Sequence, residues 1–227
     1  MNCTPRSICI SLLAALAAAC SSARHESAGP APVPPPPANT AELTALAHAR
    51  ADSARLPSTA ADAQFMTGMI HHHGQALVMA GWAPTHGASP SLQTLCSRII
   101  NAQRDEIATM QQWLRDRGYP APEPTPGPAT MKMNGMTHTM LMPGMLTEEQ
   151  MHQLDQARGE TFDSLFLTFM IQHHKGAVSM VKTLFGTYGA GQDETVFKFA
   201  NDVSVDQTTE IARMEKMLAA LPSQRAS

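Results

Sequence analysis

The chain has 227 residues and a formal net charge of −3, from 16 basic and 19 acidic side chains. The basic residues are scattered along the chain, which excludes the clustered positive charge of a nucleic-acid-binding protein. Sixteen methionines and ten histidines stand beside only four cysteines, so neither a disulfide framework nor a cysteine-rich zinc site is expected.

The first 19 residues have the pattern of an export signal. Arg6 precedes an apolar run that is too short to span a membrane as a mature helix, and small residues follow up to Cys20. This pattern resembles a lipoprotein signal peptide over residues 1–19, with Cys20 lipidated; the alternative is an ordinary secretory signal cut near Ala19. Both interpretations place the protein in the periplasm or cell envelope, and the first adds a membrane anchor.

Residues 20–40 are rich in Ser, Ala and Pro, with four consecutive prolines at 34–37. Such a composition cannot bury a core and predicts an extended, disordered spacer. Because Cys3 and Cys9 are lost with the signal and Cys20 is modified, Cys96 is the remaining free thiol. We expect it to be a small buried residue rather than a ligand.

Residues 41–117 are predicted to form the first helical repeat. Apolar residues and histidine recur at spacings of three and four, which places them on one stripe of a helix. The stripe comprises Phe65, Met69, His72, Ala76 and Met79. A second helical pattern follows a turn rich in Gly and Pro, so the repeat is read as an antiparallel helical hairpin, with a further helix possible over 41–55.

The linker, residues 118–146, is rich first in proline and then in methionine. Residues 130–145 hold six methionines and His138, a density that core packing explains poorly. No strand is predicted here. The two interpretations are a flexible apolar tether and a chain that captures Cu(I) with soft ligands.

The second helical repeat, residues 147–221, copies the first and precedes a tail at 222–227. The matched pairs are Asp62/Asp163, Phe65/Phe166, Met69/Met170, His72/His173, His73/His174, Ala76/Ala177, Met79/Met180, Gln103/Gln207, Glu106/Glu210 and Met110/Met214. Two repeated helical hairpins predict an all-α, ferritin-like four-helix bundle.

The duplicated His-His-Met pattern predicts a copper site. Thioether sulfur binds Cu(I) well, and imidazole binds copper in either oxidation state, so Cu(I) is preferred and Cu(II) is also accepted. The predicted metal ligands are His72, His73, Met69, Met79, His173, His174, Met170 and Met180. The alternative is a non-catalytic interaction or structural module in which these side chains only pack the core.

Other polar residues are weaker candidates. His71 is matched by Gln172 in the second repeat, and His48, His86 and His152 are interpreted as surface residues. Counting from the turn, with a few residues of slack for the turn itself, places Met66 roughly opposite Glu106 in the first hairpin.

No enzymatic activity is predicted. A di-iron bundle needs a Glu-x-x-His motif on two helices, whereas in this chain only Glu149 has a His, His152, three residues later. Neither a Ser-His-Asp motif nor a phosphate-binding loop occurs. The expected partners are a metal ion and, through the lipid anchor, a membrane.

Several segments together resemble one family, the domain of unknown function 305. They are FMTGMIHHHGQALVM, AQRDEIATMQQWL, MPGMLTEEQMHQLDQARGETFDSLFLTFMIQHHKGAVSM and EIARMEKML, within residues 61–221. The resemblance implies a ferritin-like fold and, as in some secreted bacterial members, copper binding by the His and Met ligands named above. His71 stands where such segments often carry Pro, so the second repeat is closer to the family pattern.

Overall fold

The computed structural model describes residues 43–44, 58–133 and 136–222. The predicted signal peptide, the spacer, Cys20 and His48 lie outside these residues, and of the helix expected over 41–55 only Leu43 and Thr44, both helical, are described. The described residues 58–133 and 136–222 belong to one compact unit, which contains the helical bundle.

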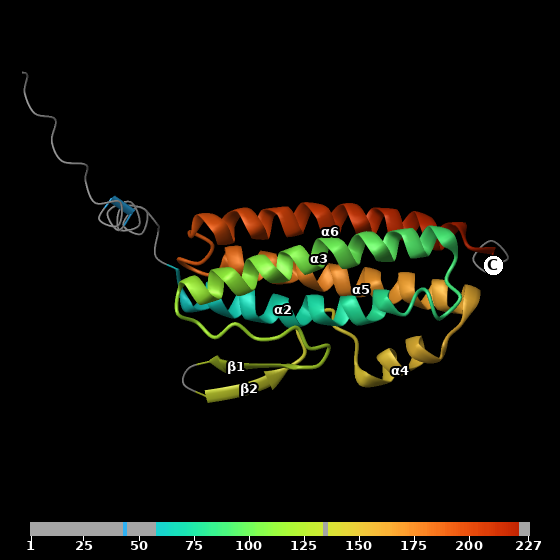
Figure 1. Cartoon of the computed structure of the whole chain (residues 1–227), viewed down its shortest axis with the longest axis horizontal. Coiled ribbons are helices and arrows are strands. Elements are labelled where there is room, and N and C mark those ends of the chain that lie inside the picture. The colour runs from blue at the N-terminus through green and yellow to red at the C-terminus, as the bar shows by residue number, and fades with distance from the viewer. Residues whose placement is uncertain (1–42, 45–57, 134–135, 223–227) are drawn as a thin grey trace, which may run out of the picture. The chain divides into compact units, whose positions relative to one another are not determined.

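Four long helices form the bundle. They are α2 (Ala60–Gly81), α3 (Pro90–Asp116), α5 (Gly159–Gly186) and α6 (Glu194–Ala220). α2 pairs with α3, α5 pairs with α6, and α2 also packs against α5, which runs in the opposite direction (Figure 1). The predicted all-α four-helix bundle made of two helical hairpins is confirmed.

An aspartate repeated in both halves joins the two hairpins. Asp62 forms a capping box with Thr59 at the start of α2, and its Oδ1 accepts a hydrogen bond of 2.7 Å from the backbone N–H of Gly191. Its counterpart Asp163 accepts hydrogen bonds of 3.2 Å from the backbone N–H of Ser89. Each aspartate therefore satisfies a buried or partly buried backbone donor next to the turn of the other repeat, where an unpaired donor would cost free energy.

The connection from α3 to α5 runs back along the bundle, because these two helices point the same way (Figure 1). It carries β1 (Ala129–Met133), β2 (Met136–Met140) and the short α4 (Glu148–Gln156). The prediction that the linker contains no strand is therefore wrong. In β2, Thr alternates with larger side chains, which suits an extended strand, and the sequence Asn-Gly between the strands favours a two-residue hairpin turn.

We call the described residues 124–133 and 136–146 the strap, because this part of the connection lies across α2 and α5. The Gln75 side chain of α2 accepts a hydrogen bond of 2.6 Å from the N–H of Leu146 and donates one of 3.0 Å to the carbonyl oxygen of the same residue. On α5, Gly176 allows a very close approach: a Cβ atom there would lie 1.9 Å from the carbonyl oxygen of Pro143. The strap is thus held to both helices.

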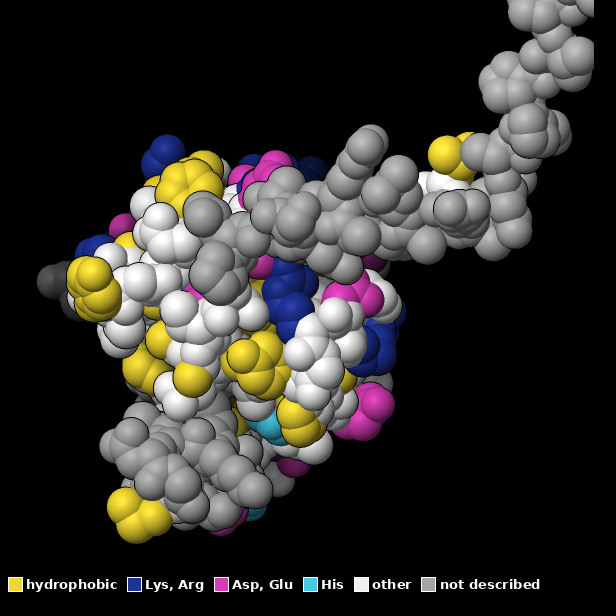
Figure 2. Space-filling model, turned by 90° about the vertical axis from the view of Figure 1, so that its left-hand side faces the viewer, with side chains coloured by type: hydrophobic (Ala, Val, Ile, Leu, Met, Phe, Trp, Pro, Cys, Tyr) yellow, Lys and Arg dark blue, Asp and Glu magenta, His cyan; other side chains and the backbone are white. Residues whose placement is uncertain are grey.

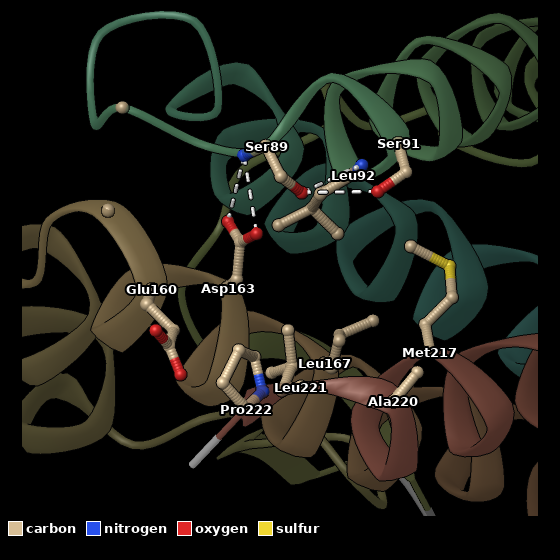
Figure 3. Close-up of a pocket in the computed structure, with 12 residues that line it drawn as sticks. Ser89, Ser91, Leu92, Glu160, Asp163, Leu167, Met217, Ala220, Leu221 and Pro222 are labelled. Carbon is tan, nitrogen blue, oxygen red and sulfur yellow. Dashed lines mark hydrogen bonds between the residues drawn. The ribbon is translucent and has the colours of Figure 1, made fainter.

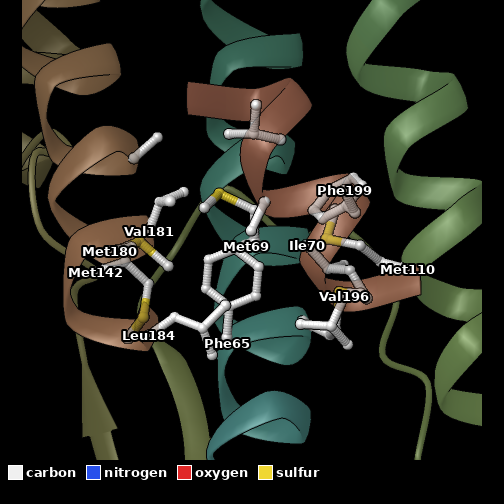
Figure 4. Close-up of a cluster of buried hydrophobic side chains, with 14 of the residues drawn as sticks. Phe65, Met69, Ile70, Met110, Met142, Met180, Val181, Leu184, Val196 and Phe199 are labelled. Carbon is white, nitrogen blue, oxygen red and sulfur yellow. The ribbon is translucent and has the colours of Figure 1, made fainter. Parts of the chain in front are cut away.

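The apolar core consists of two clusters rich in methionine. One contains Phe65, Met69 and Met180 (Figure 4), and the other contains Met79 and Met170. Because α2 and α5 are antiparallel, each cluster takes one predicted methionine ligand from each repeat.

Large apolar side chains are also exposed at the end of the bundle where α5 passes into α6. Phe185, Tyr188 and Phe197 are exposed there, and Figure 2 views the molecule from this end. Among the described helices, none combines the length and the apolarity that crossing a bilayer requires.

Candidate metal centre

Four histidines form a row through the core between α2 and α5. The rings of His72 and His173 face each other across the helix interface, with centroids 3.7 Å apart. His73 lies 6.3 Å from His72, and His174 lies 6.2 Å from His173. All four side chains are fully buried, so the fold brings together all four predicted histidine ligands.

A carboxylate closes each end of this row. Nε2 of His73 lies 2.6 Å from Oε2 of Glu106 on α3, and Nε2 of His174 lies 2.7 Å from Oε2 of Glu210 on α6. A carboxylate only accepts, so Nε2 carries the proton, and in the neutral ring Nδ1 keeps a free lone pair. Carboxylates that hold metal-binding imidazoles use this arrangement to fix the ring and raise its basicity.

Five buried ring nitrogens of this row have no hydrogen-bond partner. His72 donates through Nε2 to the carbonyl oxygen of Pro143 at 3.0 Å, but its Nδ1 is unpaired. Nδ1 of His73 and of His174 is unpaired as well, and His173 has no partner at either nitrogen. Buried polar atoms are normally satisfied. A cluster of imidazole lone pairs without partners fits a soft or borderline metal ion.

Burial keeps the two central histidines neutral. Loss of solvent holds the pKa of His72 well below its usual range, and the neighbouring His73 lowers it further. The pKa of His173 is lowered in the same way, first by burial and then by His72. The neutral imidazole is the form that binds a metal.

The row is not a finished coordination sphere. Within the described ranges, no three His, Cys, Asp or Glu side chains are grouped as a metal ion requires. The predicted methionine ligands flank the row: Met69 lies one helical turn before His72, and Met170 one turn before His173. Binding would need small ring rotations or a sulfur atom from these clusters.

The expected register of the first hairpin is wrong. Glu106 contacts His73, not the region of Met66. Side chains lean toward the N-terminus of their own helix, so His73 on α2 leans away from the turn and Glu106 on α3 leans back toward it. Glu106 and Glu210 are not among the predicted ligands, although the repeated Gln-x-x-Glu pattern places them at matched positions of the two repeats.

Three further histidines whose surroundings the structure describes, His71, His86 and His152, have structural partners or face solvent. His71 Nδ1 lies 2.8 Å from Oγ1 of Thr125 in the strap, and burial lowers its pKa. The interpretation of His86 as a surface residue is wrong, because it is 5% exposed and lies 2.9 Å from the carbonyl oxygen of Asp155. His152 is exposed, as predicted.

Two open pockets at the surface do not contain this row. One of about 420 Å³ lies at an end of the bundle and is lined by Ser89, Asp163 and Met217 among others (Figure 3). None of the predicted metal ligands lines it.

Cys96 is buried elsewhere in the core, and burial raises the pKa of its thiol to about 12.

Fold and site together define a duplicated four-helix bundle with a buried row of imidazoles between two carboxylates. The family model described as Domain of unknown function (DUF305) matches residues 62–218. The chain belongs to the DUF305 family, which confirms the resemblance found in the sequence.

Solved structures of this family are similar to the chain over most of its length. A DUF305 fragment from Deinococcus radiodurans is 28% identical with a TM-score of 0.60, and the match covers 73% of this chain and 99% of the fragment. A DUF305 protein from Streptomyces coelicolor, described as secreted, is 28% identical with a TM-score of 0.58, and the match covers 70% and 91% of the two chains.

CopM, solved in Cu(I)-, Cu(II)- and Ag-bound forms, is also similar. Its Cu(II)-bound form is 27% identical with a TM-score of 0.53, and the match covers 69% of this chain and 95% of CopM. An uncharacterized protein, L153, of Acanthamoeba polyphaga mimivirus is 36% identical over 56 residues, which are 25% of this chain and 37% of L153. The match thus spans less than half of that curated relative.

Proposed function

We propose that this protein binds copper outside the cytoplasm and sequesters it or hands it on. The buried row His73, His72, His173 and His174, with its unpaired nitrogens, is the observation that carries the proposal. The similarity to CopM, which is solved with copper and silver bound, supports the choice of metal.

The proposed ligands match the chemistry of copper. Glu106 and Glu210 hold the outer imidazoles by Nε2 and leave Nδ1 for the metal. The thioethers of Met69, Met79, Met170 and Met180 lie on either side of the row and favour Cu(I), whereas Cu(II) would depend mainly on the imidazoles. The protein's role in this proposal is binding without catalysis.

Core packing alone explains the row poorly. Five buried imidazole nitrogens and the amide groups of Gln103 and Gln207 have no partners. Each unpaired buried polar group costs about 1–3 kcal/mol, so a module selected only for packing would be more stable with apolar side chains here. A bound metal would offset this cost.

The proposed location rests on the N-terminal sequence. Residues 1–19 have the pattern of an export signal, and Cys20 is the proposed lipidation site. The DUF305 protein from Streptomyces coelicolor that resembles this chain is described as secreted.

The test is a competition titration of the mature protein with a Cu(I) chelator. We expect the wild type to retain Cu(I), and the combined substitution His173→Ala, His174→Ala and Met180→Ala to abolish retention. His152→Ala, which changes an exposed histidine, serves as the control and should leave affinity unchanged. Equal affinity of the wild type and the triple variant would overturn the site, and a wild type that retains no copper would overturn the function.

A further inference from the structure

Three carboxylates lie where α3 and α6 cover the histidine row. Glu106 and Glu210 come from equivalent positions of the two repeats, and Asp206 lies one turn before Glu210 on α6. Partial burial raises the pKa of Asp206, and the negative charge of Glu106 on the other hairpin contributes, as do Asp202 and Glu210. Asp206 is therefore close enough to both outer carboxylates to feel their charge.

These three carboxylates have no cationic partner among the described residues, unlike Asp193, Asp202 and Glu215. Among the described residues, no Lys or Arg forms an ion pair with any of them, whereas Asp202 pairs with Lys198 and Glu215 pairs with Lys175. The α3–α6 face therefore presents concentrated negative charge directly over the row.

The two outer carboxylates connect this face to the buried imidazoles. The Glu106 side chain is 20% exposed and that of Glu210 is 25% exposed, while their partners His73 and His174 are fully buried. Each glutamate thus touches solvent and the end of the row at once. A cation attracted to the face would meet a polar path inward instead of an apolar barrier.

Two buried amides lie beside this path. Gln103 and Gln207 are each 3% exposed, and neither amide atom of either residue has a hydrogen-bond partner. Each lies one turn before its glutamate, on the same face of its helix. Amide oxygens are ligands for partly hydrated cations, so these groups offer contacts that no protein atom uses.

The opposite side of the row is closed. On that side the strap crosses α2 and α5, and Gly176 packs directly against the backbone of Pro143 and Gly144. The carbonyl oxygen of Pro143 also accepts the hydrogen bond from His72. α3 and α6, by contrast, approach each other less closely than α2 and α5 do.

We propose that the α3–α6 face is the entrance by which a copper cation reaches the histidine row, and that Asp206 attracts the incoming cation without becoming one of its ligands. This inference rests on the proposed copper function. Carboxylates at the mouth of a site raise the local cation concentration and the association rate.

The experiment measures Cu(II) association with the mature protein by stopped flow, at low and at high ionic strength. Asp206→Asn should slow association about threefold at low salt, because it removes one of three charges from a field that typically gives tenfold or more. The rate should also depend less on salt. The dissociation rate and the absorption spectrum of bound Cu(II) should not change.

Asp105→Asn is the matched control. Asp105 is exposed and adjacent to Glu106 on α3, but it lies on a different face of the helix. It removes the same charge from outside the three-carboxylate group and should slow association clearly less than Asp206→Asn does. Equal rates for the two variants would overturn the entrance, and a changed Cu(II) spectrum in Asp206→Asn would make Asp206 a ligand instead. A wild type that binds no Cu(II) or Cu(I) in the same samples would instead reject the copper function itself.

Discussion

The two repeats contribute alike to the outer ends of the histidine row but differently to its centre. Glu106 and Glu210 hold His73 and His174 at nearly the same distance. In the centre, His72 donates to the strap, whereas His173, its counterpart, has no hydrogen-bond partner at either nitrogen.

The strap is the source of this difference, because it occurs once while the helices occur twice. Gly68 of α2 lies where α5 has Phe169, and the missing side chain makes room for the strap: a Cβ at Gly68 would lie 2.7 Å from Sδ of Met142. On α5, Gly176 makes room for the strap in the same way, because it packs against the strap backbone. Duplication therefore sets the outer pairs, and a single crossing segment makes the inner histidines unequal.

The largest expected effect comes from breaking the contact between α5 and the strap. In Gly176→Ala the new methyl group would overlap the carbonyl group of Pro143, so the strap must move. We expect the free energy of unfolding to fall by about 3 kcal/mol in urea titrations, as for severe overpacking. Gly186→Ala is the control, since a Cβ there has no neighbour within 4 Å, and the better helix propensity of Ala predicts a gain of up to about 1 kcal/mol. Similar behaviour of the two variants would mean that the strap is not tightly held.

A smaller effect, a loss of copper affinity, should be equal for the two His–Glu pairs at the ends of the row. Glu106→Gln and Glu210→Gln each remove the charge that holds an imidazole, and loss of such a partner typically weakens metal binding about 10- to 100-fold. We expect both variants to lose copper affinity by similar factors in the same chelator competition. If only one lost affinity, the row would contain one functional half, and the symmetry of the outer pairs would be structural only.

The sequence predicted much of this arrangement because the duplication is visible in it. The repeated stripe from Phe65 to Met79 and from Phe166 to Met180 required two equivalent helices, and antiparallel packing of those helices brings His72 to His173. The Glu partners were harder to assign, because a two-turn change of register between α2 and α3 depends on side-chain direction and not on residue spacing.

The strap could not be derived from the repeat. Its contacts involve backbone groups of Pro143 and Leu146, which carry no signal in side-chain patterns, and its hairpin depends on a long-range return of the chain along the bundle. His86 was misjudged for a related reason: its partner Asp155 lies far along the chain, after the strap. The strap is not duplicated in the sequence, so its contacts cannot be predicted by comparing the two repeats.

The subtlest prediction separates the two central histidines in the metal-free protein. Both have a pKa well below the ordinary value of about 6.5 and stay neutral in the fold. Below that pH the unfolded chain binds more protons, so the free energy of unfolding falls as the solution becomes more acidic. His72→Leu and His173→Leu should each reduce this slope by up to about 1.4 kcal/mol per pH unit. At pH 7.5, about one unit above the ordinary histidine pKa, the two variants should differ in their free energy of unfolding.

His173→Leu loses no hydrogen bond and should keep or raise the stability, whereas His72→Leu leaves the carbonyl oxygen of Pro143 without its donor and should cost about 1–2 kcal/mol. Urea titrations of both variants between about pH 5 and 8, a range that brackets the ordinary histidine pKa, measure both quantities. Equal stabilities at neutral pH would show that the strap does not distinguish the two rings. An unchanged slope in both variants would show that neither histidine is held neutral by burial.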